Sequence, residues 1–197
     1  RWFPSLPYRN LGRYRVEYTQ HKDLTLIAVG EKGEERVEGD QRTVEYTTGD
    51  VSYISFATGL YDTLYDTAGT IPVRVFLRQE NNRGLFNRGL PVRVKDDLIK
   101  ACSTFYCWFG PPVANSLDLV DQTMATGQSS RGLIHLSSYT FRNETNQSRY
   151  WAHEIAHQWW GHTVIPRTFK DVWLSEGLAE MSAAMHLLDA KTDASEY

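Results

Sequence analysis

Alternating hydrophobic and polar residues mark the first 78 residues of the chain. Residues 14–18, 43–46 and 73–76 carry apolar or aromatic side chains with a period of two, which is typical of β-strands with one buried face. Turn signals that contain glycine separate these runs, for example at residues 30–33. Short strands at this spacing predict an antiparallel β-sandwich.

The pattern changes in the second half of the chain. Between residues 95 and 109 apolar side chains recur at helical spacing, and a Gly-Pro-Pro segment ends the run, so a helix is expected there. Residues 117–120 and 132–136 indicate two further strands. An apolar and aromatic run at residues 151–161, which ends on a glycine, predicts another helix.

Composition and charge narrow the functional classes. The chain has 197 residues, enough for one large domain or two small ones. Its net charge of −3, with both signs interspersed, argues against a nucleic-acid or anionic membrane surface. No apolar run approaches the roughly 20 residues of a membrane-spanning helix, and no signal peptide is visible, so the compartment stays unknown. Cys102 and Cys107 fit no metal or redox motif and are interpreted as free thiols.

The strongest chemical signal is the pair His153 and His157, with Glu154 beside the first histidine. Positions four apart share one face of a helix, so both imidazoles can bind one zinc ion. Glu154 lies about 100° further round the helix. There it can take a proton from a zinc-bound water without occupying a coordination site. The alternative is a pair of half-buried histidines on a core helix.

A third ligand decides between these interpretations, and Glu176 is the candidate. Eighteen residues separate it from His157. Ser175 has the chemistry of an N-cap, and a helix that begins there places Glu176 in its first turn. Two imidazoles and one carboxylate leave zinc an open fourth position, as a catalytic site requires.

The His-Glu-x-x-His motif, the 18-residue interval and the segment Trp-Leu-Ser-Glu-Gly-Leu-Ala at residues 173–179 resemble the zinc signature of M1 aminopeptidases, the gluzincins related to thermolysin. Thermolysin-like endopeptidases usually hold the third ligand one residue further on, so the spacing favours M1. The resemblance implies one Zn²⁺ per chain on His153, His157 and Glu176, with Glu154 as general base. It also implies peptide substrates, hydrolysed by a zinc-activated water.

The resemblance extends to the domain organisation. The opening Trp-Phe-Pro is similar to a segment late in the family's N-terminal β domain, and residues 71–76 resemble the first strand of its catalytic domain. We therefore expect an α+β chain. Residues 1–69 are the C-terminal part of an antiparallel β-sandwich domain, and residues 70–197 are the N-terminal part of a thermolysin-like zinc metallopeptidase domain. Such a chain is a fragment, and surfaces exposed by truncation favour self-association.

Residues 125–132 depart from the family pattern. M1 aminopeptidases usually carry Gly-x-Met-Glu-Asn just before the strand at 132–136, the edge strand along which an extended peptide lies. The glutamate of that motif binds the α-amino group of the substrate. No acid occurs in this segment here, which argues against strict aminopeptidase specificity. The substrate-binding residues that the resemblance implies are Gly127, Gln128, Ser129, Ser130 and Gly132.

Two further carboxylates are candidates for supporting the ligands. Glu180 lies one turn after Glu176 and can accept the outer N–H of a ligand histidine, the alternative being a solvated surface carboxylate. Asp171 stands where the family often has an acid ahead of Trp-Leu. The family's oxyanion-stabilising tyrosine falls beyond Tyr197, so we expect weak or no hydrolysis from the chain itself.

A second hypothesis comes from a different functional class. It is a catalytically idle zinc-binding domain whose edge strand binds peptides or a partner protein. The altered segment at residues 127–131 favours this hypothesis, whereas Glu154 opposes it, because a scaffold that only holds zinc needs no general base.

Overall fold

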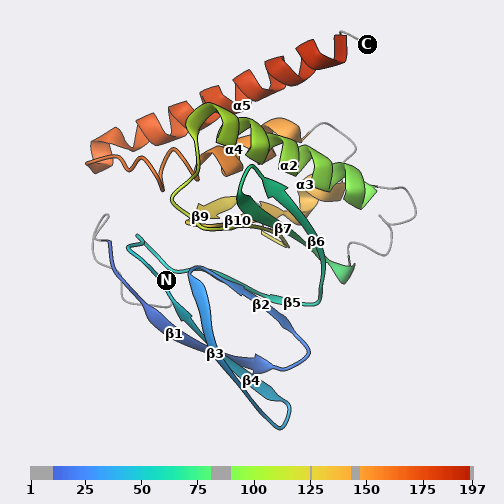
Figure 1. Cartoon of the computed structure of the whole chain (residues 1–197), viewed down its shortest axis with the longest axis vertical. Coiled ribbons are helices and arrows are strands. Elements are labelled where there is room, and N and C mark those ends of the chain that lie inside the picture. The colour runs from blue at the N-terminus through green and yellow to red at the C-terminus, as the bar shows by residue number, and fades with distance from the viewer. Residues whose placement is uncertain (1–10, 81–89, 125, 143–146, 196–197) are drawn as a thin grey trace. The chain divides into compact units, whose positions relative to one another are not determined.

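The computed structural model describes residues 11–80, 90–124, 126–142 and 147–195. The opening Trp-Phe-Pro segment and residue 125 lie outside them. The chain divides into two compact units, residues 1–60 and residues 61–197 (Figure 1). The first unit is built from strands, and the second combines a sheet with helices. None of the described helices is long and apolar enough to cross a membrane.

The first unit contains two small antiparallel sheets. In the three-stranded sheet, β4 (Gln41–Thr47) lies between β1 (Arg15–His21) and β3 (Glu31–Glu38). β2 (Thr25–Ala28) and β5 (Phe56–Gly59) form a separate ladder. Every pairing between these strands is antiparallel, as the period-two pattern predicts.

An aromatic core holds the first unit together. Tyr18 of β1 is buried with Ala28 of β2 and with Val44 and Tyr46 of β4. The rings of Tyr18 and Tyr46 meet edge to face with their centroids 5.8 Å apart, a favourable geometry for aromatic pairs. Every side chain of β3 is exposed. That strand therefore contributes ladder hydrogen bonds rather than core.

The second unit is built on a five-stranded mixed sheet in the order β6-β7-β8-β10-β9. Its inner strands, β7 (Ile71–Arg78), β8 (Leu117–Gln122) and β10 (Leu133–Ser137), run parallel. β6 (Tyr61–Ala68) and β9 (Gln128–Ser130) pair antiparallel at the two edges. One side of the β9 backbone therefore remains outside the sheet.

Helices cover one face of this sheet (Figure 1). α2 (Leu90–Phe109) connects β7 to β8 and so makes the crossover that parallel strands require. α3 (Ser138–Arg142) follows β10, and α4 (Ser148–Ala156) packs against α2, β9 and β10. The 3₁₀ turn η2 (Phe169–Asp171) leads into α5 (Val172–Ser195), which packs on α4.

One hydrophobic core joins the helices to the sheet. Its fully buried members include Leu98 and Phe105 of α2, Ile155 of α4, Leu119 of β8 and Ile134 of β10. Burying a side chain of this size stabilises the fold by about 1.5–3 kcal/mol. The core therefore fixes the position of α4 relative to the sheet.

The predicted α+β fold class is confirmed. The domain boundary between residues 69 and 70 stays a prediction, and β6, which begins at Tyr61, belongs with β7 to the sheet of the second unit. The prediction that residues 132–136 form the edge strand is wrong, because β10 lies between β8 and β9. Gly132, at φ 76°, lets the chain reverse so that β9 occupies the edge.

Candidate metal centre

α4 carries the His-Glu-x-x-His motif opposite its apolar face. His153, Glu154 and His157 are partly exposed. His157 is the C-cap residue, yet it keeps helical backbone angles of φ −61° and ψ −17°, so the two imidazoles remain on one face. The helix ends earlier than the predicted Gly161. The opposite face is buried through Trp151, Ala152, Ile155 and Ala156.

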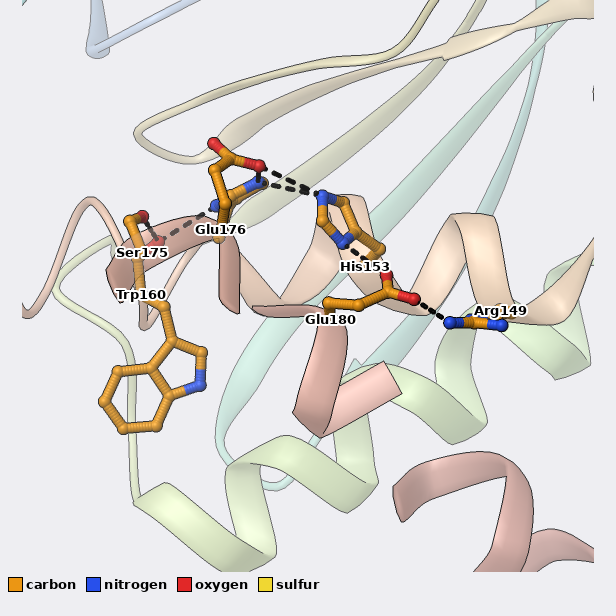
Figure 2. A network of polar contacts seen from close by, with 7 residues as sticks. Arg149, His153, Trp160, Ser175, Glu176 and Glu180 are labelled. Carbon is orange, nitrogen blue, oxygen red and sulfur yellow. Dashed lines mark hydrogen bonds and ion pairs between the residues drawn. The ribbon is translucent and has the colours of Figure 1, made fainter. Parts of the chain in front are cut away.

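α5 brings the third predicted ligand to α4. The predicted helix start at Ser175 is wrong, because α5 begins at Val172, directly after η2. The Ser175 hydroxyl instead donates a hydrogen bond to the carbonyl oxygen of Trp160, which ties α5 to the turn after α4. Glu176 consequently lies in the second turn of α5 and points toward His153 (Figure 2).

Three potential ligand atoms form a nearly equilateral triangle. Nε2 of His153 lies 3.2 Å from Nε2 of His157, and both nitrogens lie 3.5 Å from Oε2 of Glu176. A point in the plane of such a triangle lies about 2.0 Å from all three atoms, which matches zinc–nitrogen and zinc–oxygen bond lengths of about 2.0–2.2 Å. The three residues therefore fit one zinc ion, with a fourth position left for water.

The hydrogen bonds of the two Nδ1 atoms explain why the three potential ligand atoms suit a cation. Nδ1 of His157 lies 2.9 Å from the carbonyl oxygen of Trp160, which can only accept a hydrogen bond. Nδ1 of His153 lies 3.0 Å from Oε2 of Glu180. Both Nδ1 atoms are therefore donors, and in neutral rings both Nε2 atoms carry lone pairs. Together with Glu176, three lone pairs converge, and a cation at their centre removes the repulsion.

Glu180, which the sequence predicts to support a ligand histidine, lies in contact with His153. One carboxylate oxygen accepts the hydrogen bond from His153, and the other forms an ion pair with Arg149 (Figure 2). Burial raises the pKa of Glu180, but Arg149 and His153 outweigh this effect, so the pKa lies below its ordinary value. The carboxylate therefore stays ionised and holds the His153 ring in one orientation.

Glu154, the predicted general base, lies against the backbone of Gly127. A methyl group at Gly127 would come within 2.6 Å of Glu154 Oε1, so a side chain at this position would force the carboxylate to shift. Burial raises the pKa of Glu154, His157 lowers it and the Glu176 carboxylate raises it, which leaves the pKa above its ordinary value. A carboxylate with a raised pKa accepts a proton more readily near neutral pH.

Gln158, directly after the second histidine, fixes the edge strand. Its buried amide nitrogen donates to Ser129 Oγ at 2.7 Å and to the Ser130 carbonyl oxygen at 2.8 Å. Its side-chain oxygen accepts from the N–H of Gly132 at 2.8 Å. Three contacts from one side chain therefore hold β9 beside α4. The predicted substrate-binding residues all lie in β9 or next to it, with Gln128 exposed and Ser129 and Ser130 buried.

Asp171 contacts Thr168 rather than a predicted ligand. Its carboxylate accepts hydrogen bonds from the N–H of Thr168 at 3.0 Å and from its hydroxyl at 2.7 Å. The bond from the Thr168 N–H is the carboxylate half of the capping box of η2. Among the described contacts, none joins Asp171 to the histidines or to Glu176. Its role beside the ligands stays a prediction.

Three residues at the site were not singled out from the sequence. Arg149 and Tyr150 stand four residues before His153 and Glu154, so helical spacing alone could have pointed to them. The role of Gln158 depends on where β9 folds back, and no local pattern carries that information.

Comparisons with known proteins agree with this geometry. The family model for the peptidase family M1 domain matches residues 121–196. A comparison with curated proteins found no match. Among solved structures, the chain is similar to a crystal structure of a mutant M1 zinc metallopeptidase from Deinococcus radiodurans, with a TM-score of 0.67 and 21% sequence identity. The match covers 93% of this chain but 42% of that chain, so this chain spans less than half of its length. Residues 121–196 thus match the peptidase family M1 domain, and the chain has the fold of an M1 zinc metallopeptidase.

Proposed function

We propose that the chain carries the zinc-binding part of a metallopeptidase active site, and that the protein to which it belongs hydrolyses peptide bonds. The observation that carries the proposal is the convergence of three lone pairs, from His153, His157 and Glu176, at mutual distances of 3.2–3.5 Å. Two histidines and one carboxylate are a ligand set that leaves zinc an open position for catalysis.

The residues around the ligands support hydrolysis by an activated water. When bound, one zinc ion per chain would lower the pKa of a coordinated water to about 7 and polarise the scissile carbonyl. Glu154 takes a proton from the attacking water on a carboxylate oxygen and gives it to the departing amine nitrogen. Its raised pKa suits both transfers. Glu180 holds the His153 ring so that Nε2 remains available to the metal.

The edge strand supports a peptide as the substrate. An extended peptide can pair with the outer side of β9 through main-chain hydrogen bonds, which tolerate many side chains. Residues 126–132 contain no acid, and Ser129 is bonded to the Gln158 amide. A substrate ammonium group held there would lose its hydration without gaining a counter-charge from this segment. We therefore propose internal peptide segments, or peptides with a blocked amino terminus, as the preferred substrates.

A second candidate function is a zinc-holding module that binds peptides without cleaving them. The absence of an acid from residues 126–132 favours it. The position of Glu154 against Gly127, beside the ligands, favours the peptidase.

Zinc content tests the metal site. Elemental analysis of the purified chain should find one zinc per chain, and His153→Ala and Glu176→Ala should each remove it. His21→Ala is a matched control, because His21 is exposed on β1 and should leave the zinc in place. Zinc that survives both ligand substitutions would overturn the assignment.

Hydrolysis separates the two candidate functions. A longer protein that contains this chain should cleave N-acetylated peptides, and Glu154→Gln should abolish cleavage while the zinc stays bound. Zinc binding with no cleavage by the unmodified longer protein would favour the peptide-binding module. Cleavage that persists in the Glu154→Gln variant would show that another group is the base.

A further inference from the structure

Tyr150 places a hydroxyl group beside the proposed general base. The residue stands four positions before Glu154 on α4, one turn away along the helix. A methyl group at Gly127 would come within 2.4 Å of the Tyr150 hydroxyl oxygen and within 2.6 Å of Glu154 Oε1. The two oxygens therefore lie within about 5 Å of each other, a span that one water can bridge.

The hydroxyl group is buried and has no hydrogen-bond partner among the described residues. Its oxygen is shielded from solvent, and no hydrogen bond of ordinary geometry reaches it. The backbones of Ser137 and Gly127 lie close enough to lower its pKa, but neither reaches ordinary hydrogen-bond geometry or accepts the O–H proton. A buried hydroxyl without a partner is costly, and such groups often have a functional role or bind a water.

The charges around the hydroxyl indicate its partner. Burial, and after it the Glu154 carboxylate, raises the pKa of Tyr150 to about 12, so the phenol keeps its proton at neutral pH. A phenol O–H can donate, and an ionised carboxylate has lone pairs that accept. Among the described residues, Glu154 on the same helix is the charged group that acts on this hydroxyl.

We propose that Tyr150 is a positioning residue for Glu154, and that its phenol hydroxyl donates a hydrogen bond to the Glu154 carboxylate, directly or through one water. The bond fixes the orientation of the Glu154 carboxylate before substrate binds. Gly127 has the complementary role, because a side chain there would fill the space between the two groups. This inference rests on the proposed function, since it assigns a role to the neighbour of the general base.

The substitution Tyr150→Phe separates positioning from simple packing. It keeps the aromatic ring and removes only the oxygen. If the hydroxyl had no partner, its removal would raise the stability of the chain and leave catalysis unchanged. A hydrogen bond to a charged group predicts the opposite for the reaction, a decrease in kcat of about tenfold with KM unchanged. Tyr65→Phe is the matched control, because Tyr65 is 72% exposed on β6.

Nuclear magnetic resonance tests the contact on residues 1–197 themselves, without requiring hydrolysis. Tyrosines labelled with carbon-13 at Cζ are recorded in the zinc-loaded chain, and the signal that disappears in Tyr150→Phe is assigned to Tyr150. Donation to a carboxylate moves this signal toward the phenolate position, so Glu154→Gln should move it back while the Tyr65 signal stays fixed. A Tyr150 signal that Glu154→Gln leaves in place would overturn the proposal.

Kinetics on the longer protein distinguish this proposal from the proposed function. Loss of cleavage in Glu154→Gln together with unchanged kcat in Tyr150→Phe would overturn only the role of Tyr150. Full cleavage by Glu154→Gln would overturn the role of Glu154 as base. The magnetic resonance result would then still decide whether the two side chains are bonded.

Discussion

Replacing Glu180 by glutamine should weaken zinc binding without destroying the site. The substitution keeps the shape of the side chain and a neutral acceptor, but it removes the charge that faces Nδ1 of His153 at 3.0 Å. The ring of His153 then loses part of the force that orients it, and its Nε2 becomes a weaker donor to the metal. The three ligand atoms themselves are unchanged.

The magnitude follows from the exposure of the carboxylate. A hydrogen bond to a charged group contributes about 1.5–3 kcal/mol. The Glu180 side chain is 44% exposed, so solvent screening places its bond at the lower end of that range. About 1.4 kcal/mol corresponds to a tenfold change in the dissociation constant. We therefore expect zinc to bind about tenfold more weakly to Glu180→Gln, which agrees with the effect of outer hydrogen-bond partners in other zinc sites.

Competition with a chromophoric zinc chelator at fixed pH measures this difference on the chain itself. Glu38→Gln serves as control, because Glu38 is exposed on β3. Arg149→Met should weaken binding less than about threefold, since the Arg149–Glu180 ion pair is largely exposed. If Glu180→Gln binds zinc as tightly as the unmodified chain while Glu176→Ala has lost it, Glu180 does not support the ligand and the reasoning is wrong.

Three further predictions concern the edge strand, pH and association. In the longer protein, Gly127→Ala should keep zinc and lower the rate of peptide hydrolysis by about 10², because the new methyl group displaces the Glu154 carboxylate. Gly33→Ala is the control: its nearest new contact would be 3.4 Å away, so zinc content and hydrolysis should both stay unchanged. Burial lowers the pKa of His135 to about 4 from 6.5, so the unfolded chain binds this proton more tightly and stability falls as the pH drops below about 6.5. Urea unfolding should show that the unmodified chain loses about 2 kcal/mol more than His135→Asn between pH 7 and pH 5, and equal losses would contradict this account. We also propose that the chain self-associates through the exposed methionines of α5. Light scattering should then find a smaller mass for the double variant Met181→Lys/Met185→Lys than for the unmodified chain. An unmodified chain that is already monomeric would refute this proposal.

Local patterns in the sequence predicted much of the architecture. The period of two in residues 14–18 and 43–46 gave strands because alternate side chains point to opposite faces of a sheet. The helical spacing in residues 95–109 gave α2, although the helix begins earlier, at Leu90. These features depend on residues only a few positions apart in the chain, so the local sequence pattern is enough to predict them.

The two histidine ligands could also be predicted from the local sequence. His153 and His157 stand four residues apart, and a helix brings their Nε2 atoms to 3.2 Å for geometric reasons alone. Glu176 was predicted from its spacing and from the family resemblance. The reason given for its placement, a helix start at Ser175, was wrong, because that hydroxyl bonds the carbonyl oxygen of Trp160 instead.

The tertiary structure decided which distant groups complete the site. The packing of α5 on α4 places Glu180 at His153, and the reversal at Gly132 puts β9 at the edge in place of residues 132–136. Gln158 then holds that edge with three hydrogen bonds. The sequence by itself determined the metal-binding face of one helix and the elements around it. The groups that orient that face come from other elements, and their approach depends on how whole side-chain surfaces pack, which no short-range pattern encodes.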